Sequence, residues 1–289
     1  MLVSVVIPAY HAAATIARAV TSLLRQTWTD WEGIVVSDDG SDYAAVLRRA
    51  GIADERLRFV STGRVGSGCH RARNVGLAAA RGELIAALDA DDLLSAAHIE
   101  TLRPVALAAG AAAGNVRVVD EATGAELHRA FASDRAPDRL GIAALLDLSV
   151  PLLPLVAREQ AEPRIDGIEF GEDLVANLRL IERLRAIQVT PECLYEYRVI
   201  DGSLCHHSQS ARIFEQSYSS LIARLETGDR MGLSPTNAAL ARDGLLRKRN
   251  FNRAFAAARL ANPKLNFQTF AAGRRRHGSR VNPASRAPY

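Results

Sequence analysis

The chain has 289 residues but only three cysteines, Cys69, Cys193 and Cys205, at scattered spacing. It contains no CxxC pair and no Cys/His zinc pattern, which argues against a disulfide framework or a structural zinc site and favours a reducing compartment. A basic leader is also missing, because the first apolar run follows Met1 directly. We therefore expect a cytoplasmic protein whose first element is a strand and not a signal peptide.

Long hydrophobic runs are missing as well. The most apolar stretch, residues 140–157, is interrupted by Asp147, Pro151 and Pro154 and falls short of the roughly 20 apolar residues that a membrane span requires. We expect a buried helix and loop here, and an acceptor pocket or a membrane-facing edge is the alternative. With 48% apolar and 24% charged residues, the chain has the composition of a folded globular domain.

Apolar segments with the period of a strand alternate with helical segments in the first 92 residues. Strands are predicted at residues 3–7, 33–37, 57–61 and 84–88, and helices at residues 15–26, 43–50 and 69–80. This alternation predicts a parallel sheet with right-handed crossovers, in which ligands bind beyond the carboxyl ends of the strands. Those ends carry Pro8-Ala9-Tyr10, Asp38-Asp39, the loop 63–68 and Asp89–Asp92. The unusual chemistry of the sequence is thus expected at one edge of one sheet.

The pattern changes after Asp92. Helices are predicted near residues 96–109 and from Gly171 to about Arg185, and strands near residues 113–119, 187–189 and 195–198. Two further helices are predicted at residues 213–225 and 236–260, followed by a disordered basic tail from about Phe270.

The segment LIAALDADD, residues 84–92, brings three carboxylates to the end of an apolar strand, where burying unpaired charge is costly. Asp89 and Asp91 are one residue apart, so both can converge on a hard divalent cation, Mg²⁺ or Mn²⁺, and leave sites for phosphate oxygens. In the alternative, the cluster is a solvated turn in which Asp92 caps the following helix.

A second acidic cluster, DDGSD at residues 38–42, follows the second predicted strand. A carboxylate only accepts hydrogen bonds, so Asp39 suits the N–H of uracil or a ribose hydroxyl. Tyr10, at the adjacent strand end, is able to stack on a flat base. Read alone, DDGSD is also typical of a turn and helix cap.

Glycines at residues 66 and 68 precede Arg71 and Arg73 at a predicted helix start. Flexible backbone and guanidinium groups both suit a diphosphate, so we assign Arg73 to nucleotide binding. A dinucleotide fingerprint does not fit, because position 71 has arginine in place of the third glycine, and a Walker pattern is absent.

Five segments occur in order along the chain: SVVIPAY, VVSDDGSD, GSGCHRARNVGLAAARGELIAALDADD, GEDLVANLRL and YEYRVIDGSL. Together they resemble family 2 glycosyltransferases of the GT-A fold, over roughly residues 2–205. The resemblance implies an α/β fold with a Rossmann-like, mostly parallel sheet flanked by helices. We expect a nucleotide-sugar half at residues 1–92, an acceptor half at 93–205 and a basic helical extension at 206–289.

The resemblance also implies roles for individual residues. Asp39 is expected to recognise the uracil of a UDP-sugar beside the loop Pro8-Ala9-Tyr10. Asp89 is expected at the ribose and Asp91 at a Mn²⁺ or Mg²⁺ ion that stabilises the leaving UDP as a Lewis acid.

Asp173, in GEDLVANLRL, is the general base that the resemblance implies, and direct displacement at the anomeric carbon would invert its configuration. Taken alone, Glu172-Asp173 is also an acidic pair favoured at a helix N-terminus. His206 lies where some GT-A enzymes place a metal-ligating histidine, and otherwise His206 and His207 are loop histidines. The signature of processive polymer synthases is missing, which favours transfer of a single sugar.

Charge is distributed unevenly. Residues 206–289 hold 15 basic and 4 acidic residues, whereas residues 1–205 hold 21 basic and 28 acidic ones. The basic extension suggests peripheral attachment to an anionic membrane, which sedimentation with anionic liposomes can test, and a solvated helical face is the alternative. We expect no nucleic-acid partner, because aromatic residues are not interleaved with the arginines of the tail.

The sequence therefore predicts an inverting, metal-dependent glycosyltransferase. It would move one sugar from a nucleotide-sugar to a hydroxyl of a saccharide or lipid-linked acceptor in cell-surface polysaccharide or glycolipid assembly. The alternative is a non-catalytic GT-A-fold protein that only binds sugar nucleotides. A sugar-nucleotide pyrophosphorylase is disfavoured, because PAYHAAATI lacks the glycine-rich, arginine-containing loop expected after the first strand.

Overall fold

The structure is a computed structural model that describes residues 1–131, 136–168, 170–200 and 209–278, with side chains described to residue 273. The described residues form one sheet with the strands β1 Val3–Ala9, β2 Trp31–Ser37, β3 Leu57–Ser61, β4 Leu84–Ala87, β5 Leu93–Leu94, β6 Ala111–Asp120, β7 Glu126–Arg129, β8 Arg139–Leu140, β9 Leu155–Ala157 and β10 Ile187–Val199. The helices are α1 Ile16–Leu24, α2 Tyr43–Arg49, α3 Cys69–Ala79, α4 His98–Ala109, α5 Ile142–Asp147, α6 Glu172–Leu184, α7 Ser210–Glu226, α8 Pro235–Ala261 and α9 Phe267–Gly278.

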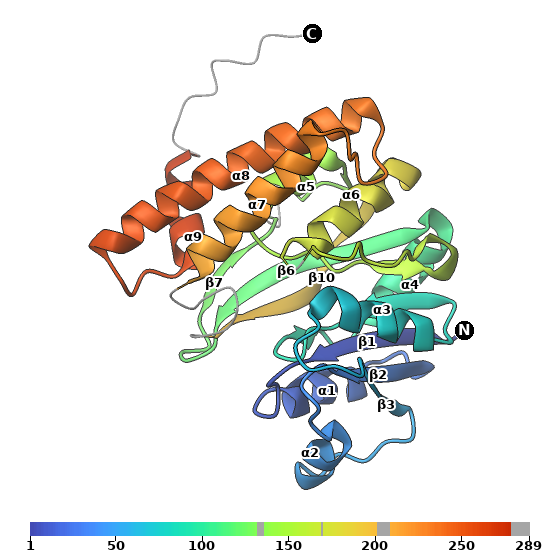
Figure 1. Cartoon of the computed structure of the whole chain (residues 1–289). Helices are drawn as coiled ribbons and strands as arrows, with labels where there is room; N and C mark the ends of the chain where they lie inside the picture. Colours follow the sequence, from blue (N-terminus) through green and yellow to red (C-terminus); the bar gives the residue numbers. More distant parts are fainter. Residues whose placement is uncertain (132–135, 169, 201–208, 279–289) are drawn as a thin grey trace.

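The first half of the sheet is parallel, as its sequence pattern predicts. Strands β3, β2, β1 and β4 are neighbours in that order, and each pair runs in the same direction. Every residue of β2 and all but one of β1 are buried, because apolar residues cover both faces of these strands. The predicted α/β architecture is confirmed, and the carboxyl ends of β1, β2 and β4 lie at one edge (Figure 1).

The second half of the sheet differs from the prediction in two places. Leu155–Ala157, expected within a helix and loop, forms β9, which pairs antiparallel with both β4 and β6 and joins the two halves. The two short strands expected after residue 186 are one long strand, β10, with an irregular register between Thr190 and Leu194. Pro191 lies in this irregular stretch, where its missing N–H is tolerated.

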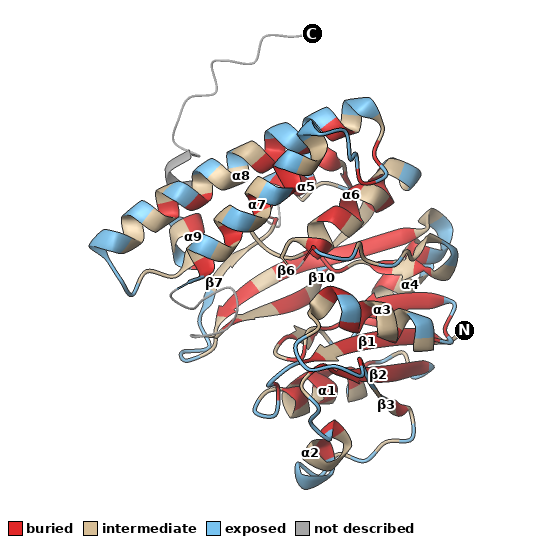
Figure 2. Ribbon diagram, in the orientation of Figure 1, coloured by how far each residue is buried: buried red, intermediate tan, exposed pale blue. Residues whose placement is uncertain are grey.

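The helices α5, α6, α7 and α8 lie together on one side of the second half of the sheet (Figure 1). A separate apolar cluster joins α6 to α7 and α8 and includes Val175, Phe214 and Leu245. Gly244 of α8 allows the close approach to α5, because a Cβ atom there would lie 2.6 Å from Leu146. The faces that these helices turn to one another are buried, whereas their outer faces are exposed (Figure 2).

The basic tail was expected to be disordered from about Phe270, and this expectation is wrong for residues 270–278, which belong to α9. Gln268 and Ala271 of α9 are 3% and 2% exposed. The reason is aromatic packing, because Phe267 and Phe270 both contact the rings of Phe251 and Phe255 on α8.

Among the described helices, none combines the length and the apolar character that crossing a membrane requires.

Candidate active site

The acidic segment after β4 is attached to β10 by its last residue. Asp92 is 1% exposed, and its carboxylate accepts hydrogen bonds from the Tyr195 hydroxyl at 2.8 Å and from the Arg198 N–H at 2.8 Å. Burial, together with the charges of Asp91 and Asp89, raises the pKa of Asp92 well above its usual value. The alternative in which Asp92 caps a helix is wrong, because α4 begins only at His98, with Ala97 at its N-cap.

Tyr195 also fixes the position of Asp89. Its hydroxyl oxygen accepts a hydrogen bond from the Asp89 N–H at 3.2 Å while it donates to Asp92. One buried side chain of β10 therefore holds both ends of the segment Asp89–Asp92.

Asp91 has the environment of a carboxylate that is suited to a cation. Burial raises its pKa to about 6, and the neighbouring charge of Asp89 contributes to the rise. Within the part of the chain that the structure describes, no other side chain donates a hydrogen bond to this carboxylate; Arg18 donates to the backbone carbonyl of Asp91 at 3.0 Å instead. A hard divalent cation with oxygen ligands, Mg²⁺ or Mn²⁺, fits this unpaired oxygen donor.

The described residues contain no cluster of three or more acidic, histidine or cysteine side chains that would complete a metal site on their own. His206, the other predicted metal ligand, and His207 lie outside the described residues. The assignment of a metal to Asp91 and His206 stays a prediction.

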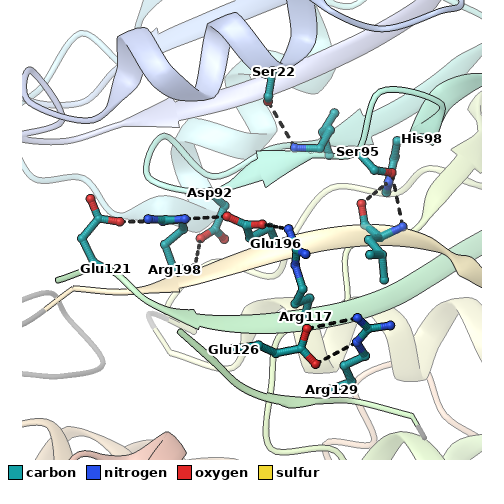
Figure 3. A network of polar contacts seen from close by, with 12 residues as sticks. Ser22, Asp92, Ser95, His98, Arg117, Glu121, Glu126, Arg129, Glu196 and Arg198 are labelled. Carbon is teal, nitrogen blue, oxygen red and sulfur yellow. Dashed lines mark hydrogen bonds and ion pairs between the residues drawn. The ribbon is translucent and has the colours of Figure 1, made fainter. Parts of the chain in front are cut away.

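Beneath this segment lies a network of charged residues that the sequence analysis did not identify. Arg198 donates to Glu121 at 2.5 Å and to Glu196 at 2.6 Å, and Arg117 pairs with Glu196 (Figure 3). Arg18 also pairs with Glu121. These residues come from α1, from β6 and its end, and from β10, so they join elements about 80 to 100 positions apart. Glu196 and Arg198 belong to the segment YEYRVIDGSL that the sequence analysis singled out, whereas no local pattern pointed to Arg18, Arg117 or Glu121.

Asp39 and Asp38 are both turned into the protein. The side chain of Asp39 is 2% exposed and accepts hydrogen bonds from the N–H groups of His11 and Ser41 and from the hydroxyls of Tyr43 and Ser37. These four bonds fill the acceptor positions that a carboxylate offers. Asp39 therefore orders the loop that follows β1. Direct recognition of uracil by Asp39 stays a prediction, and it requires that the N–H of the base take the place of one of these four donors.

The neighbouring residues of this loop are placed as follows. Ala9 is buried, Pro8 is half-buried, and Tyr10 is 52% exposed, with its hydroxyl near Gly66 of the glycine-containing loop. An exposed tyrosine ring beside this loop is compatible with stacking on a base.

We expect Asp39→Asn to destabilise the protein by about 2 kcal/mol at pH 7. Burial alone would raise the pKa of Asp39, but the hydrogen bonds from Ser41, His11 and Tyr43 outweigh it and lower the pKa to about 2. Because the folded-state pKa is lowered, this stabilisation is present above about pH 4 and is lost as the pH falls towards 2. Denaturant unfolding between pH 3 and pH 7 measures it. Asp243→Asn, at an exposed side chain of α8, is the control, and equal losses for the two variants would contradict the prediction.

Arg73 connects the segment after β4 to the start of α6. It is 7% exposed and pairs with Asp89 through one nitrogen and with Glu172 through another. Glu172, 5% exposed, also accepts from Arg164 at 2.8 Å. Burial works against the charge of Arg73, yet the carboxylates around it, Asp89 first among them, raise its pKa. Burial and the charge of Arg73 lower the pKa of Arg164 to about 10.

Asp173 is the second residue of α6, directly after Glu172. It lines a cleft of about 510 Å³ whose wall also contains Arg73, Asp89 and Glu172. Three of the predicted site residues, Arg73, Asp89 and Asp173, are thus brought together. Among the described residues, Asp39 and Asp91 do not belong to the lining of this cleft. The roles assigned to all of these residues remain to be tested.

The comparisons with known proteins agree with this architecture. The model of the family "Glycosyl transferase family 2" matches residues 4–146. The succinoglycan biosynthesis protein ExoO of Rhizobium meliloti is 30% identical over 218 residues, which cover 70% of this chain and 62% of ExoO. The Escherichia coli UDP-Glc:alpha-D-GlcNAc-diphosphoundecaprenol beta-1,3-glucosyltransferase WfgD is 37% identical over 99 residues, which cover 34% of this chain and 38% of WfgD. The chain thus spans less than two thirds of either relative.

Solved structures show the same fold at low sequence identity. The structure of S. aureus TarS 1-349 in complex with UDP-GlcNAc has a TM-score of 0.68 at 16% identity, covering 94% of this chain and 79% of TarS 1-349. The mannosyltransferase PcManGT from Pyrobaculum calidifontis, in complex with GDP-Man and Mn²⁺, has a TM-score of 0.58 at 18% identity, covering 96% of this chain and 79% of that chain. With the sheet order and the family match, these findings identify the chain as a GT-A-fold member of glycosyl transferase family 2.

Proposed function

We propose that the protein is an inverting glycosyltransferase that moves one sugar from a UDP-sugar to a hydroxyl of a saccharide or lipid-linked acceptor. The observation that carries the proposal is the cleft shared by Asp89, expected at the donor, and Asp173, the expected base. The ion pairs of Arg73 with Asp89 and Glu172 hold these two parts of the site together. The names of the relatives, which refer to succinoglycan biosynthesis and to GlcNAc-diphosphoundecaprenol, support polysaccharide or glycolipid assembly as the process.

In this proposal Asp173 accepts the proton of the acceptor hydroxyl while the hydroxyl oxygen attacks the anomeric carbon. The new C–O bond forms on the face opposite the bond to the UDP oxygen, which breaks in the same step, so the configuration inverts. Arg73 is buried and lines the cleft, and its guanidinium contributes positive charge near the diphosphate of the donor.

Asp91 would hold a Mg²⁺ or Mn²⁺ ion, together with Asp89 or a ligand outside the described residues. When bound, the ion would neutralise the diphosphate and stabilise UDP as the leaving group. Peripheral attachment to an anionic membrane through the basic extension stays a prediction. Several of its arginines are already paired with acids, for example Arg253 with Glu215 and Arg224 with Asp229.

Calorimetric titration of UDP, GDP and dTDP, with and without Mn²⁺, tests the donor and the metal. We expect UDP to bind in the presence of Mn²⁺, and Asp91→Ala to weaken this binding by about 10- to 100-fold, because the substitution removes a metal ligand. Asp166→Ala, at an exposed residue before α6, is the control.

Equal UDP affinity in wild type and Asp91→Ala would contradict the metal site. If GDP or dTDP bound more strongly than UDP, that nucleotide would be assigned as the donor nucleotide instead. Metal-dependent UDP binding without turnover of any UDP-sugar would favour the non-catalytic alternative.

A further inference from the structure

The cleft that contains Asp173 extends beyond the groups that the proposed reaction uses. At about 510 Å³ it lies in the volume range of small-molecule sites, whereas packed interiors leave few voids larger than a water molecule. Its lining includes the charged side chains of Arg73, Asp89 and Asp173. These charged side chains are the ones that the proposed reaction uses at the donor and as the base. The rest of the wall takes no part in that reaction.

The remaining wall is predominantly apolar and comes from five parts of the chain. It includes Val150 and Pro151 from the segment between α5 and β9, Phe170 directly before α6, Phe214 of α7, Phe251 of α8 and Phe267 of α9. Contacts among the rings make this wall continuous. Phe170 stacks on Phe214 with 4.3 Å between the ring centroids, and Phe267 contacts both Phe214 and Phe251. Since Phe170 lies three residues before Asp173, the apolar wall begins beside the expected base.

A saccharide alone does not account for this wall. Sugar hydroxyls require hydrogen-bonding partners, whereas phenylalanine, proline and valine side chains offer none and gain from contact with hydrocarbon. The ligand that matches the wall is therefore largely apolar at this end and carries a hydroxyl group at the end near Asp173.

Two cationic residues of α8 lie among the apolar groups of the same cleft. The Nζ atom of Lys248 donates to the backbone carbonyl of Leu148, which places the ammonium group at the segment that precedes Val150. The side chain of Arg247 is 59% exposed and lies 3.7 Å from Asp147, so it forms at most a weak surface ion pair. These cations match an anionic group at the point where the hydrocarbon is joined to the rest of the ligand.

We propose that the cleft binds an acceptor whose hydrocarbon chain, attached through a phosphate, lies on the wall formed by α7, α8, α9 and the segment after α5. Arg247 and Lys248 bind the phosphate, and the sugar beyond it reaches Asp173. The assignment rests on the proposed transferase function and names the acceptor as a long-chain lipid phosphate. It corresponds to the alternative of an acceptor pocket that the apolar run at residues 140–157 left open.

Equilibrium dialysis with farnesyl phosphate, below its micelle concentration and in EDTA, tests the site without the donor reaction. We expect saturable binding to one site, unaffected by saturating UDP and Mn²⁺ in a parallel experiment without EDTA. Geranyl phosphate, which is five carbons shorter, should bind at least tenfold more weakly, because each buried methylene strengthens binding by about fourfold. Farnesol should bind more weakly than farnesyl phosphate, and inorganic phosphate should show no saturable binding in the same range.

Two variants and two matched controls locate the site. Val150→Asp places a carboxylate in the apolar wall and should weaken farnesyl phosphate binding at least tenfold. Arg247→Glu should weaken farnesyl phosphate but not farnesol. Leu240→Asp and Arg242→Glu introduce the same acidic side chains at exposed positions of α8 outside the cleft and should leave both affinities unchanged. Because Arg247 is exposed, Arg247→Glu decides the question even where Val150→Asp fails to fold.

The proposal is overturned if farnesyl phosphate does not bind saturably, if UDP and Mn²⁺ displace it, or if the control variants weaken it as much as the cleft variants. Binding only to vesicles of anionic phospholipid, and not to monomeric farnesyl phosphate, would also overturn it in favour of a membrane surface. UDP titration is a separate measurement. If the wild-type protein bound farnesyl phosphate but not UDP, the result would contradict the transferase function and not this site.

Discussion

Asp173→Asn is expected to lower kcat by at least about 1,000-fold while UDP binding in the presence of Mn²⁺ stays within about twofold of wild type. Asparagine has nearly the shape of aspartate but cannot accept the proton of the acceptor hydroxyl. The pairing of Arg73 with Asp89 and Glu172 does not involve Asp173, so the donor side of the cleft keeps its geometry. Initial rates with saturating donor and acceptor, together with calorimetric titration of UDP, measure the two quantities.

The control for this prediction is Asp166→Asn, which changes an exposed aspartate in the loop before α6. It should leave kcat and UDP affinity unchanged. A kcat within tenfold of wild type for Asp173→Asn would mean that the base lies elsewhere, and Asp173 would then be an acidic residue that stabilises the N-terminus of α6 through the helix dipole.

The first half of the fold was predictable because local pattern and final structure agree there. The strands β1 and β2 are largely apolar, with Ser4 and Glu32 as polar exceptions near their starts, and such runs have few positions other than the interior of a parallel sheet. Since the ends of parallel strands meet at one edge, the order of the motifs along the chain was enough to bring Arg73 and Asp89 together.

The second half was less predictable because its decisive contacts are non-local. Leu155–Ala157 is a short apolar segment beside two prolines, and only its place between β4 and β6 makes it a strand. One ion pair of Arg198 is formed with Glu121, 77 positions away, which no periodic pattern identifies. At α9 a signal did exist: the aromatic residues at positions 267 and 270 match the spacing of one helix face, although the arginines that follow favoured disorder.

The prediction with the largest expected effect on stability concerns the residue next to the expected base. Glu172→Gln should lower the free energy of unfolding by about 3–5 kcal/mol, because it removes the charge that the buried guanidinium of Arg73 shares with the partly buried one of Arg164. The side chain of Arg73 is 8% exposed and that of Arg164 is 23% exposed, so water compensates little for the lost partner of Arg73. Denaturant unfolding at pH 7 measures the loss.

Glu192→Gln, at an exposed glutamate of β10, is the matched control and should change stability by less than about 0.5 kcal/mol. A loss below about 1 kcal/mol for Glu172→Gln would show that Asp89 and solvent are sufficient partners for Arg73. The two neighbouring acids of α6 should therefore respond in opposite ways: Asp173→Asn removes activity from a stable protein, whereas Glu172→Gln weakens the fold that joins the donor side of the cleft to the base. If both substitutions lowered stability equally, Asp173 would share the structural role of Glu172 and its assignment as the base would lose its main support.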